Sequence, residues 1–165
     1  EALRFVRKNA ERLGVDPEQV GVCGGSAGGH LAAYTSTFTP DEEKPAFSIL
    51  FYPVITGETW ESHQDSFAQL LGKKRTIAEQ EYYSLHNRVT PTTPPALILL
   101  SDDDAEVPTL SSILYYNALK YYGIPASMHI WPNEGHGWAA KPWCTCWDKA
   151  KPIIEDWLSI QRKNQ

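Results

Sequence analysis

A serine surrounded by glycines is the first part of this sequence that could carry chemistry. Residues 24–29 read Gly-Gly-Ser-Ala-Gly-Gly and fit the pattern G-x-S-x-G, between an apolar run and a segment of small residues. Such a corner from strand to helix needs glycines, because only residues without a Cβ let the chain pass closely on both sides of the nucleophile. The corner would expose the Ser26 hydroxyl. It would also place the Ala27 N–H at a helix N-terminus, where it can stabilise a developing oxyanion.

Two later segments could supply the groups that a serine nucleophile requires. Serine is a weak nucleophile until a histidine accepts its proton and a carboxylate orients that histidine. Asp102, Asp103 and Asp104 follow one apolar run, and His136 follows the next. The order serine, acid, histidine is typical of hydrolases with this corner, and parallel α/β sheets place their sites at the carboxyl ends of strands. Together these segments predict a serine hydrolase site.

The elements that must position these residues alternate along the chain. Periodicity and turn signals predict helices over 1–13, 27–38, 77–85, 108–122 and 147–160, and strands over 20–23, 47–52, 96–100 and 126–131. This alternation predicts an α/β fold with a mostly parallel sheet flanked by helices. Residues 56–92 fit the alternation poorly, and we interpret them as a cap-like insertion within a single domain over 1–165.

Composition excludes several other classes of protein. Of the 165 residues, 42% are apolar and 21% are charged, which excludes a disordered or coiled-coil chain. The net charge is −5 and the longest basic run covers only residues 73–75, so no nucleic-acid partner is expected. No apolar run approaches the roughly 18 residues of a membrane span, so no membrane partner is expected either.

The cysteines indicate neither a disulfide framework nor a metal site. Cys23, Cys144 and Cys146 are odd in number, the last two are too close to bridge comfortably, and zinc would need more soft ligands. The glycine-rich corner also lacks the spacing of dinucleotide and phosphate loops. We therefore expect no metal and no cofactor, with Cys23 a small core residue and the other two free thiols.

Three segments resemble one family of enzymes. Residues 25–32 read Gly-Ser-Ala-Gly-Gly-His-Leu-Ala, residues 134–138 read Glu-Gly-His-Gly-Trp, and residues 99–108 end in Val-Pro. They resemble the GxSAGGHLA corner, the GGHG(W/F) loop and the HGxxDxxVP stretch of α/β-hydrolase esterases related to acetyl, acetylxylan and feruloyl esterases. In that stretch the acid lies four residues before the proline, which selects Asp104. The His-Gly that opens the stretch in the family is absent here.

This resemblance implies a fold, a triad and an activity. The fold would be a partial α/β-hydrolase, truncated at its N-terminus, with about four of the usual eight strands. The triad would be Ser26, Asp104 and His136, with Ala27 as the oxyanion donor. The activity would be that of a serine esterase acting on small esters or acylated sugars, most closely acetyl or feruloyl esters of carbohydrate. The family analogy favours a secreted or periplasmic location, although a chain that begins with Glu1 does not define one.

Two further implications concern the sheet edge and the substrate. No His-Gly-Gly loop, which completes the oxyanion hole in the family, occurs in the sequence, and the first strands of the family's sheet are missing. The strand over 20–23 would then be an open edge, so we expect a homo-oligomer through that edge or a poorly stable chain. Gly25 and Trp138 are the expected substrate-binding residues. Trp138 would equally fit packing under Trp143 and Trp147.

Alternative interpretations stay open at this stage. A prolyl-oligopeptidase-type serine peptidase shares the corner and the residue order, but it usually carries an aromatic residue where this chain has Ala27. A catalytically weak module that only binds or assembles is the other alternative, because the oxyanion loop is absent. Among the remaining candidates, His30 is interpreted as structural, and His63 and Ser66 as part of a solvated loop.

Overall fold

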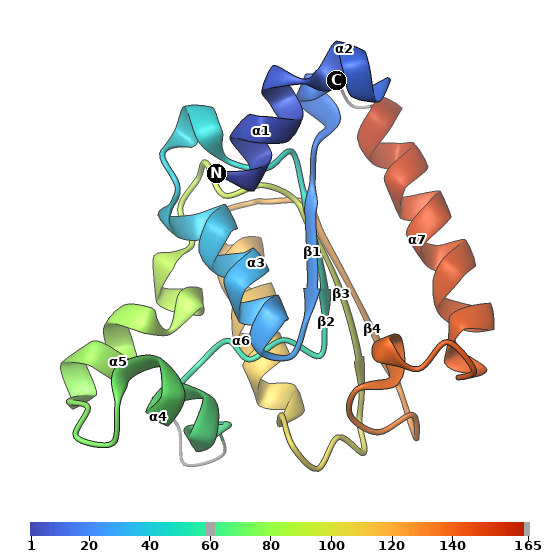
Figure 1. Ribbon diagram of the computed structural model, residues 1–165. Coiled ribbons are helices and arrows are strands. Elements are labelled where there is room, and N and C mark those ends of the chain that lie inside the picture. Colours follow the sequence, from blue (N-terminus) through green and yellow to red (C-terminus); the bar gives the residue numbers. More distant parts are fainter. Residues whose placement is uncertain (59–61, 164–165) are drawn as a thin grey trace.

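A four-stranded parallel sheet lies between two layers of helices in the computed structural model, which describes residues 1–58 and 62–163 (Figure 1). The strands lie side by side in chain order: β1 (Val22–Gly25), β2 (Ser48–Phe51), β3 (Ala96–Ser101) and β4 (Ala126–Trp131). All three neighbouring pairs are parallel. The predicted α/β fold class with a parallel sheet is therefore confirmed.

Helices cover both faces of this sheet. The α-helices are α1 (Ala2–Lys8), α2 (Ala10–Leu13), α3 (Ala27–Phe38), α4 (Gln64–Leu71), α5 (Ile77–Tyr83), α6 (Thr109–Tyr121) and α7 (Cys146–Lys163). Helix α3 packs on β1 and β2, and α6 packs on β3 and β4, while α7 covers the opposite face over β3 (Figure 1). The strands β2 and β3 are consequently buried along their whole length, which explains their continuous apolar sequences.

Small residues let α3 lie close to the sheet, as the sequence predicted. Gly29, Ala32, Ala33 and Ser36 are the buried positions of this helix. A Cβ added to Gly29 would stand 2.7 Å from Cβ of Pro53, in the segment after β2. The helix that begins at the serine corner is thus held directly against β1 and β2.

Two expected elements have different bounds in the structure. The strand expected at 20–23 is β1, which runs on to Gly25, because Gly24 and Gly25 pair with Leu50 and Phe51 of β2. The helix expected over 1–13 is interrupted at Asn9, whose side-chain amide donates to the Phe5 carbonyl at 2.8 Å. A side chain that competes for a helix carbonyl in this way favours a break.

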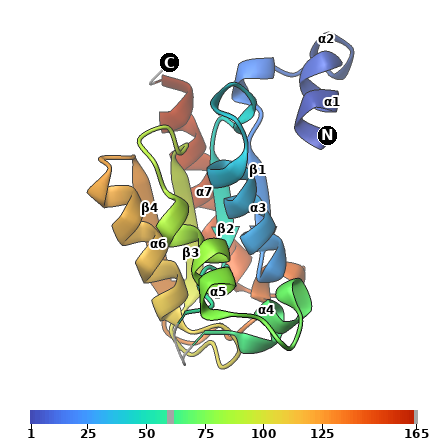
Figure 2. The same cartoon turned by 90° about the vertical axis from the view of Figure 1, so that its left-hand side faces the viewer.

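The segment between β2 and β3 lies at the carboxyl end of the sheet, beside α3 (Figure 2). Its described part contains α4, α5 and the 3-10 helix η3 (Leu85–Arg88). The expected helix over 77–85 corresponds to α5, which begins with a capping box between Thr76 and Glu79. Helix α4 was not predicted; it is held to the body of the protein by Phe67, which is buried. That residues 56–92 act as a cap stays a prediction.

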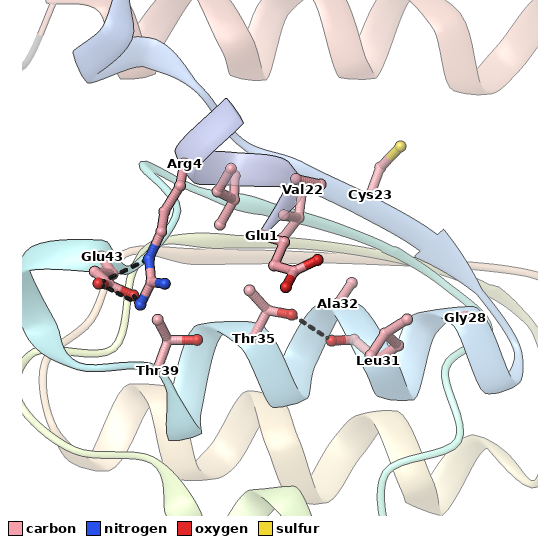
Figure 3. A pocket seen from close by; sticks show the side chains of 12 residues that line it. Glu1, Arg4, Val22, Cys23, Gly28, Leu31, Ala32, Thr35, Thr39 and Glu43 are labelled. Carbon is pink, nitrogen blue, oxygen red and sulfur yellow. Dashed lines mark hydrogen bonds and ion pairs between the residues drawn. The ribbon is translucent and has the colours of Figure 1, made fainter. Parts of the chain in front are cut away.

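The outer edge of β1 has no strand partner among the described residues. Helix α1 lies beside β1 and is joined by an ion pair between Arg4 and Glu43 to the segment that precedes β2. A groove of about 420 Å³ opens between α1, β1 and α3, and Leu31 is 65% exposed beside it (Figure 3). Cys23 is exposed, so its interpretation as a core residue is wrong: it lies on the edge strand, pointing away from α3.

We expect this edge either to mediate self-association or to leave the chain poorly stable, because an exposed row of backbone N–H and C=O groups is a template for another strand. The 18.5 kDa chain should be a dimer or larger species in light scattering under reducing conditions, with an oligomerisation that depends on concentration, or a monomer with a low melting temperature. Cys23→Lys places a charge on the edge and should give a monomer with a lower melting temperature. A wild-type chain that is a monodisperse monomer with a high melting temperature would contradict this expectation.

Candidate active site

The backbone at Ser26 has a conformation that L-residues seldom adopt. Its φ is 55° and its ψ is −123°, at the junction between β1 and α3. Hydrogen bonds fix both of its peptide groups: the Ser26 N–H donates to the Phe51 carbonyl at 3.0 Å, and the Ser26 carbonyl accepts from the N–H groups of His30 and Val54. Strain of this kind costs of order 1–3 kcal/mol and persists only where the surroundings determine it. The corner therefore presents the hydroxyl of Ser26 at the carboxyl end of the sheet.

The structure brings Ser26, His136 and Asp104 into one chain of hydrogen bonds. His136 Nε2 lies 2.9 Å from Ser26 Oγ, and His136 Nδ1 lies 2.7 Å from Asp104 Oδ2. The other oxygen of Asp104 accepts the N–H groups of Glu106 and Val107, each at 2.9 Å. An ionised Asp104 therefore favours the imidazole tautomer with its proton on Nδ1, which leaves Nε2 free to accept the serine proton.

Of three consecutive aspartates, only Asp104 faces the histidine. Its side chain is 1% exposed, whereas Asp102 is exposed. Asp103 instead accepts hydrogen bonds from the Ser101 hydroxyl at 2.6 Å and from the Gly135 N–H at 2.8 Å. Both hydrogen bonds lower the pKa of the Asp103 carboxyl, and the bond from Ser101 has the larger effect. Asp103 thus joins the loop after β3 to the loop that carries His136, a role that the sequence analysis did not predict.

The other predicted site residues lie in different places. Ala27 is the first residue of α3, where its N–H has no acceptor within the helix, directly beside the Ser26 hydroxyl. Gly25 lines a cavity of about 360 Å³ together with Ser26, Tyr52, His136 and Trp147. A side chain at Gly25 would narrow this cavity, since its Cβ would stand 3.1 Å from the Tyr52 ring.

Trp138 does not line this cavity. It is fully buried, with its ring within 6 Å of the rings of Phe51, Trp131 and Trp147. Trp143, the other expected packing partner, is largely exposed. The expectation that Trp138 binds substrate is therefore not supported: the residue lies in the aromatic core beneath the histidine loop.

The remaining histidines of the candidate set have local roles. His30 Nε2 lies 3.1 Å from the Tyr83 carbonyl, and burial lowers the pKa of the His30 imidazole. His63 is the N-cap of α4, where its Nδ1 accepts the Ser66 N–H. The contact of His30 agrees with its interpretation as a structural residue. His63 was expected in a solvated loop, but it caps a helix instead.

Two residues near His136 were missed by the sequence analysis. Glu106 places a carboxylate oxygen 3.9 Å from His136 Nε2. The ring of Tyr52 lies 4.7 Å from the imidazole, between centroids. Tyr52 follows β2, so its place at the carboxyl end of a strand was the available signal.

The part of the chain that the structure describes holds no cluster of three or more metal-ligating side chains. In residues 1–58 and 62–163, no helix has the length and apolar character needed to cross a membrane.

A strained serine after one parallel strand, with an acid and a histidine after two later strands, defines an α/β-hydrolase. The chain belongs to the prolyl oligopeptidase family, whose model matches residues 2–148. The predicted resemblance to α/β-hydrolase esterases is confirmed as well, because the relatives of this chain include an acetylxylan esterase.

Three similar proteins illustrate this relationship. The chain is 38% identical to an acetylxylan esterase of Xylanibacter ruminicola over 96% of its own length and 34% of that protein. It is 35% identical to endo-1,4-beta-xylanase B of Butyrivibrio fibrisolvens, over 82% of this chain and 23% of that protein. The solved acetyl ester-xyloside bifunctional hydrolase of Caldicellulosiruptor lactoaceticus matches with a TM-score of 0.85 and 33% identity, covering 96% of this chain and 62% of that one. The chain thus spans about a third or less of the two sequence relatives.

The glycines of the corner should tolerate substitution very differently. A Cβ at Gly24 would stand 2.2 Å from the backbone oxygen of Gly28, whereas a Cβ at Gly28 would meet nothing within 4 Å. We expect Gly24→Ala to lower the free energy of unfolding by about 1–3 kcal/mol, because backbone must move. Gly28→Ala should raise the free energy of unfolding by about 0.4–1 kcal/mol, because alanine lowers the conformational entropy of the unfolded chain. Urea denaturation of both variants tests this, and equal effects would contradict the geometry.

Proposed function

We propose that this chain carries the catalytic residues of a serine esterase. The observation that carries the proposal is the hydrogen-bonded series from the Asp104 carboxylate through His136 to the Ser26 hydroxyl. Its three members come from the ends of three different strands. Such a series is what a serine needs to become a nucleophile at neutral pH.

The reaction follows from this arrangement. Ser26 Oγ attacks the ester carbonyl carbon while His136 Nε2 accepts the hydroxyl proton, and Asp104 holds the resulting imidazolium. The C–O bond to the alcohol then breaks, and His136 returns the proton to the departing oxygen. The acyl group remains on Ser26 until a water molecule, deprotonated by the same Nε2, attacks its carbonyl carbon. The bond from that carbon to Ser26 Oγ then breaks, His136 returns the proton to Oγ, and the acid is released.

The sequence supplies only part of the oxyanion hole that the family uses. The Ala27 N–H, at the start of α3, is the donor that the chain supplies. The His-Gly-Gly pattern that would provide further N–H groups is absent from the 165 residues. Because loss of one oxyanion donor typically costs a factor of 10²–10³ in kcat, the chain alone should be a slow esterase.

The substrate class that we propose is an acetyl or feruloyl ester of carbohydrate. The names of the acetylxylan esterase and the acetyl ester-xyloside hydrolase support this class. The cavity beside Ser26 is also lined by the aromatic residues Phe51 and Trp147, which suit an apolar acyl group.

A serine peptidase of the prolyl oligopeptidase type is the second candidate, because the matching family model carries that name. Hydrolysis of acetylated xylo-oligosaccharides and of dipeptide anilides by the same preparation separates the two. The proposal expects turnover of the acetyl esters and none of the anilides; the reverse preference would favour the peptidase.

Asp103 and Asp104 are neighbours in the sequence, and a comparison of their variants tests whether Asp104 is the acid of the triad. Asp104→Asn should lower kcat for p-nitrophenyl acetate by roughly 10³–10⁴-fold, the loss seen when a serine triad loses its carboxylate. Asp103→Asn is the matched control: it removes one charge from the adjacent residue, which contacts Ser101 and Gly135 but not His136.

We expect the Asp103 variant to retain activity within about 10-fold, since it disturbs only the loop that carries the histidine. Comparable loss in both variants, or full activity of Asp104→Asn, would contradict the assignment of Asp104.

A further inference from the structure

Tyr52 contacts both halves of the candidate site and belongs to none of its motifs. Its side chain is buried, and its ring centroid lies 4.7 Å from that of His136, with an angle of 59° between the planes. The same ring lies against Gly25, immediately before Ser26, at 3.1 Å from where a Cβ would stand. One rigid side chain therefore packs against both the serine corner and the catalytic base.

The hydroxyl of Tyr52 binds the histidine loop on the C-terminal side of His136. Tyr52 Oη accepts the N–H of Ala139 at 3.2 Å, three residues after His136. Burial raises the pKa of the Tyr52 phenol, so the group stays neutral and keeps this role at physiological pH. The loop is thus fixed on both sides of the imidazole: Asp104 binds Nδ1, and Tyr52 contacts the ring and the following backbone.

The backbone of Tyr52 indicates that this placement is specifically maintained. Its φ is 36°, and among the described residues only Ser26 and Tyr52 are non-glycine residues with a positive φ. The Tyr52 N–H donates to the Leu99 carbonyl at 2.8 Å, which anchors the strained residue to β3. Strained residues persist where the surroundings determine them, and they gather at functional sites.

We propose that Tyr52 is the positioning residue of the base, holding the His136 ring between the carboxylate of Asp104 and the hydroxyl of Ser26. This inference rests on the proposed esterase function and deepens it. When His136 takes up the serine proton it becomes a cation, and an aromatic ring at this distance also stabilises that charge. Both effects are greatest in the transition state, so loss of the ring lowers kcat more than it changes KM.

Three variants test the role of Tyr52. Tyr52→Leu removes the ring, and Tyr52→Phe keeps the ring but loses the hydroxyl that binds Ala139. Tyr115→Leu is the control for loss of a buried aromatic residue, because Tyr115 is fully buried in α6 and has no contact with the triad in the structure. We measure kcat and KM for p-nitrophenyl acetate, the melting temperature, and the proton NMR signal of the His136 Nδ1–H.

We expect Tyr52→Leu to lower kcat by roughly 10- to 100-fold with KM changed less than about 3-fold, and Tyr52→Phe to restore most of the loss. Tyr115→Leu should lower the melting temperature and leave kcat unchanged. The Nδ1–H signal should persist in Tyr52→Phe and broaden or disappear in Tyr52→Leu, because the ring no longer fixes the imidazole against Asp104.

A Tyr52→Leu variant with wild-type kcat and an unchanged Nδ1–H signal would overturn the positioning role. A wild-type chain without esterase activity would instead count against the proposed function. The NMR signal would still decide the role of Tyr52 in that case, since it requires no turnover.

Discussion

Ser26 has a backbone conformation that costs free energy, and the surrounding structure is arranged to maintain it. Its peptide groups are bound by β2, by the segment after β2 and by the first turn of α3. The glycines nearby follow from the same constraint: Gly24 has no room for a Cβ beside the backbone of Gly28, and Gly29 has none beside Pro53. The close packing of α3 on the sheet is therefore a condition for exposing the hydroxyl, and the buried apolar strands β2 and β3 provide the rigid support.

The position of His136 depends on a second set of contacts, and this set shares one residue, Tyr52, with the contacts around Ser26. The Asp104 side chain is buried, and its carboxyl oxygens are hydrogen-bonded by two backbone N–H groups and by His136, so its polar atoms have partners inside the protein. Asp103 and Ser101 bind the loop before the histidine, and Tyr52 binds the loop after it. The same Tyr52 lies against Gly25 in the serine corner. Ser26 and His136 are thus supported by shared residues, although they are 110 positions apart in the sequence.

The sequence predicted what depends on local pattern. The bounds of α3 and β4 were predicted correctly, because small residues at helical spacing and a short apolar run between turns are strong local signals. Chain order and the ends of the strands predicted a serine, one of three aspartates and a histidine, and only the family resemblance selected Asp104 among the aspartates. The extension of β1 to Gly25 was not predicted, since glycine has little preference for strands and the pairing partner is β2, far along the chain. Burial was predicted less well: Cys23 is exposed, although it was expected in the core, and the two interpretations of Trp138 could not be separated, because each depends on which other segment covers the residue. Tyr52 has the position after a strand that sites favour, but its contact with His136 was missed because that contact depends on a loop more than 80 residues later in the chain.

The reaction of Ser26 with a fluorophosphonate tests the central claim most directly, because the probe requires an activated serine and no particular substrate. The intact mass of the wild-type chain is measured after incubation with the probe, beside a Ser26→Ala variant treated in the same way. Our account predicts a single adduct on the wild-type chain and none on the variant. An unmodified wild-type chain, or an equal adduct on Ser26→Ala, would contradict the claim that these residues assemble a working nucleophile.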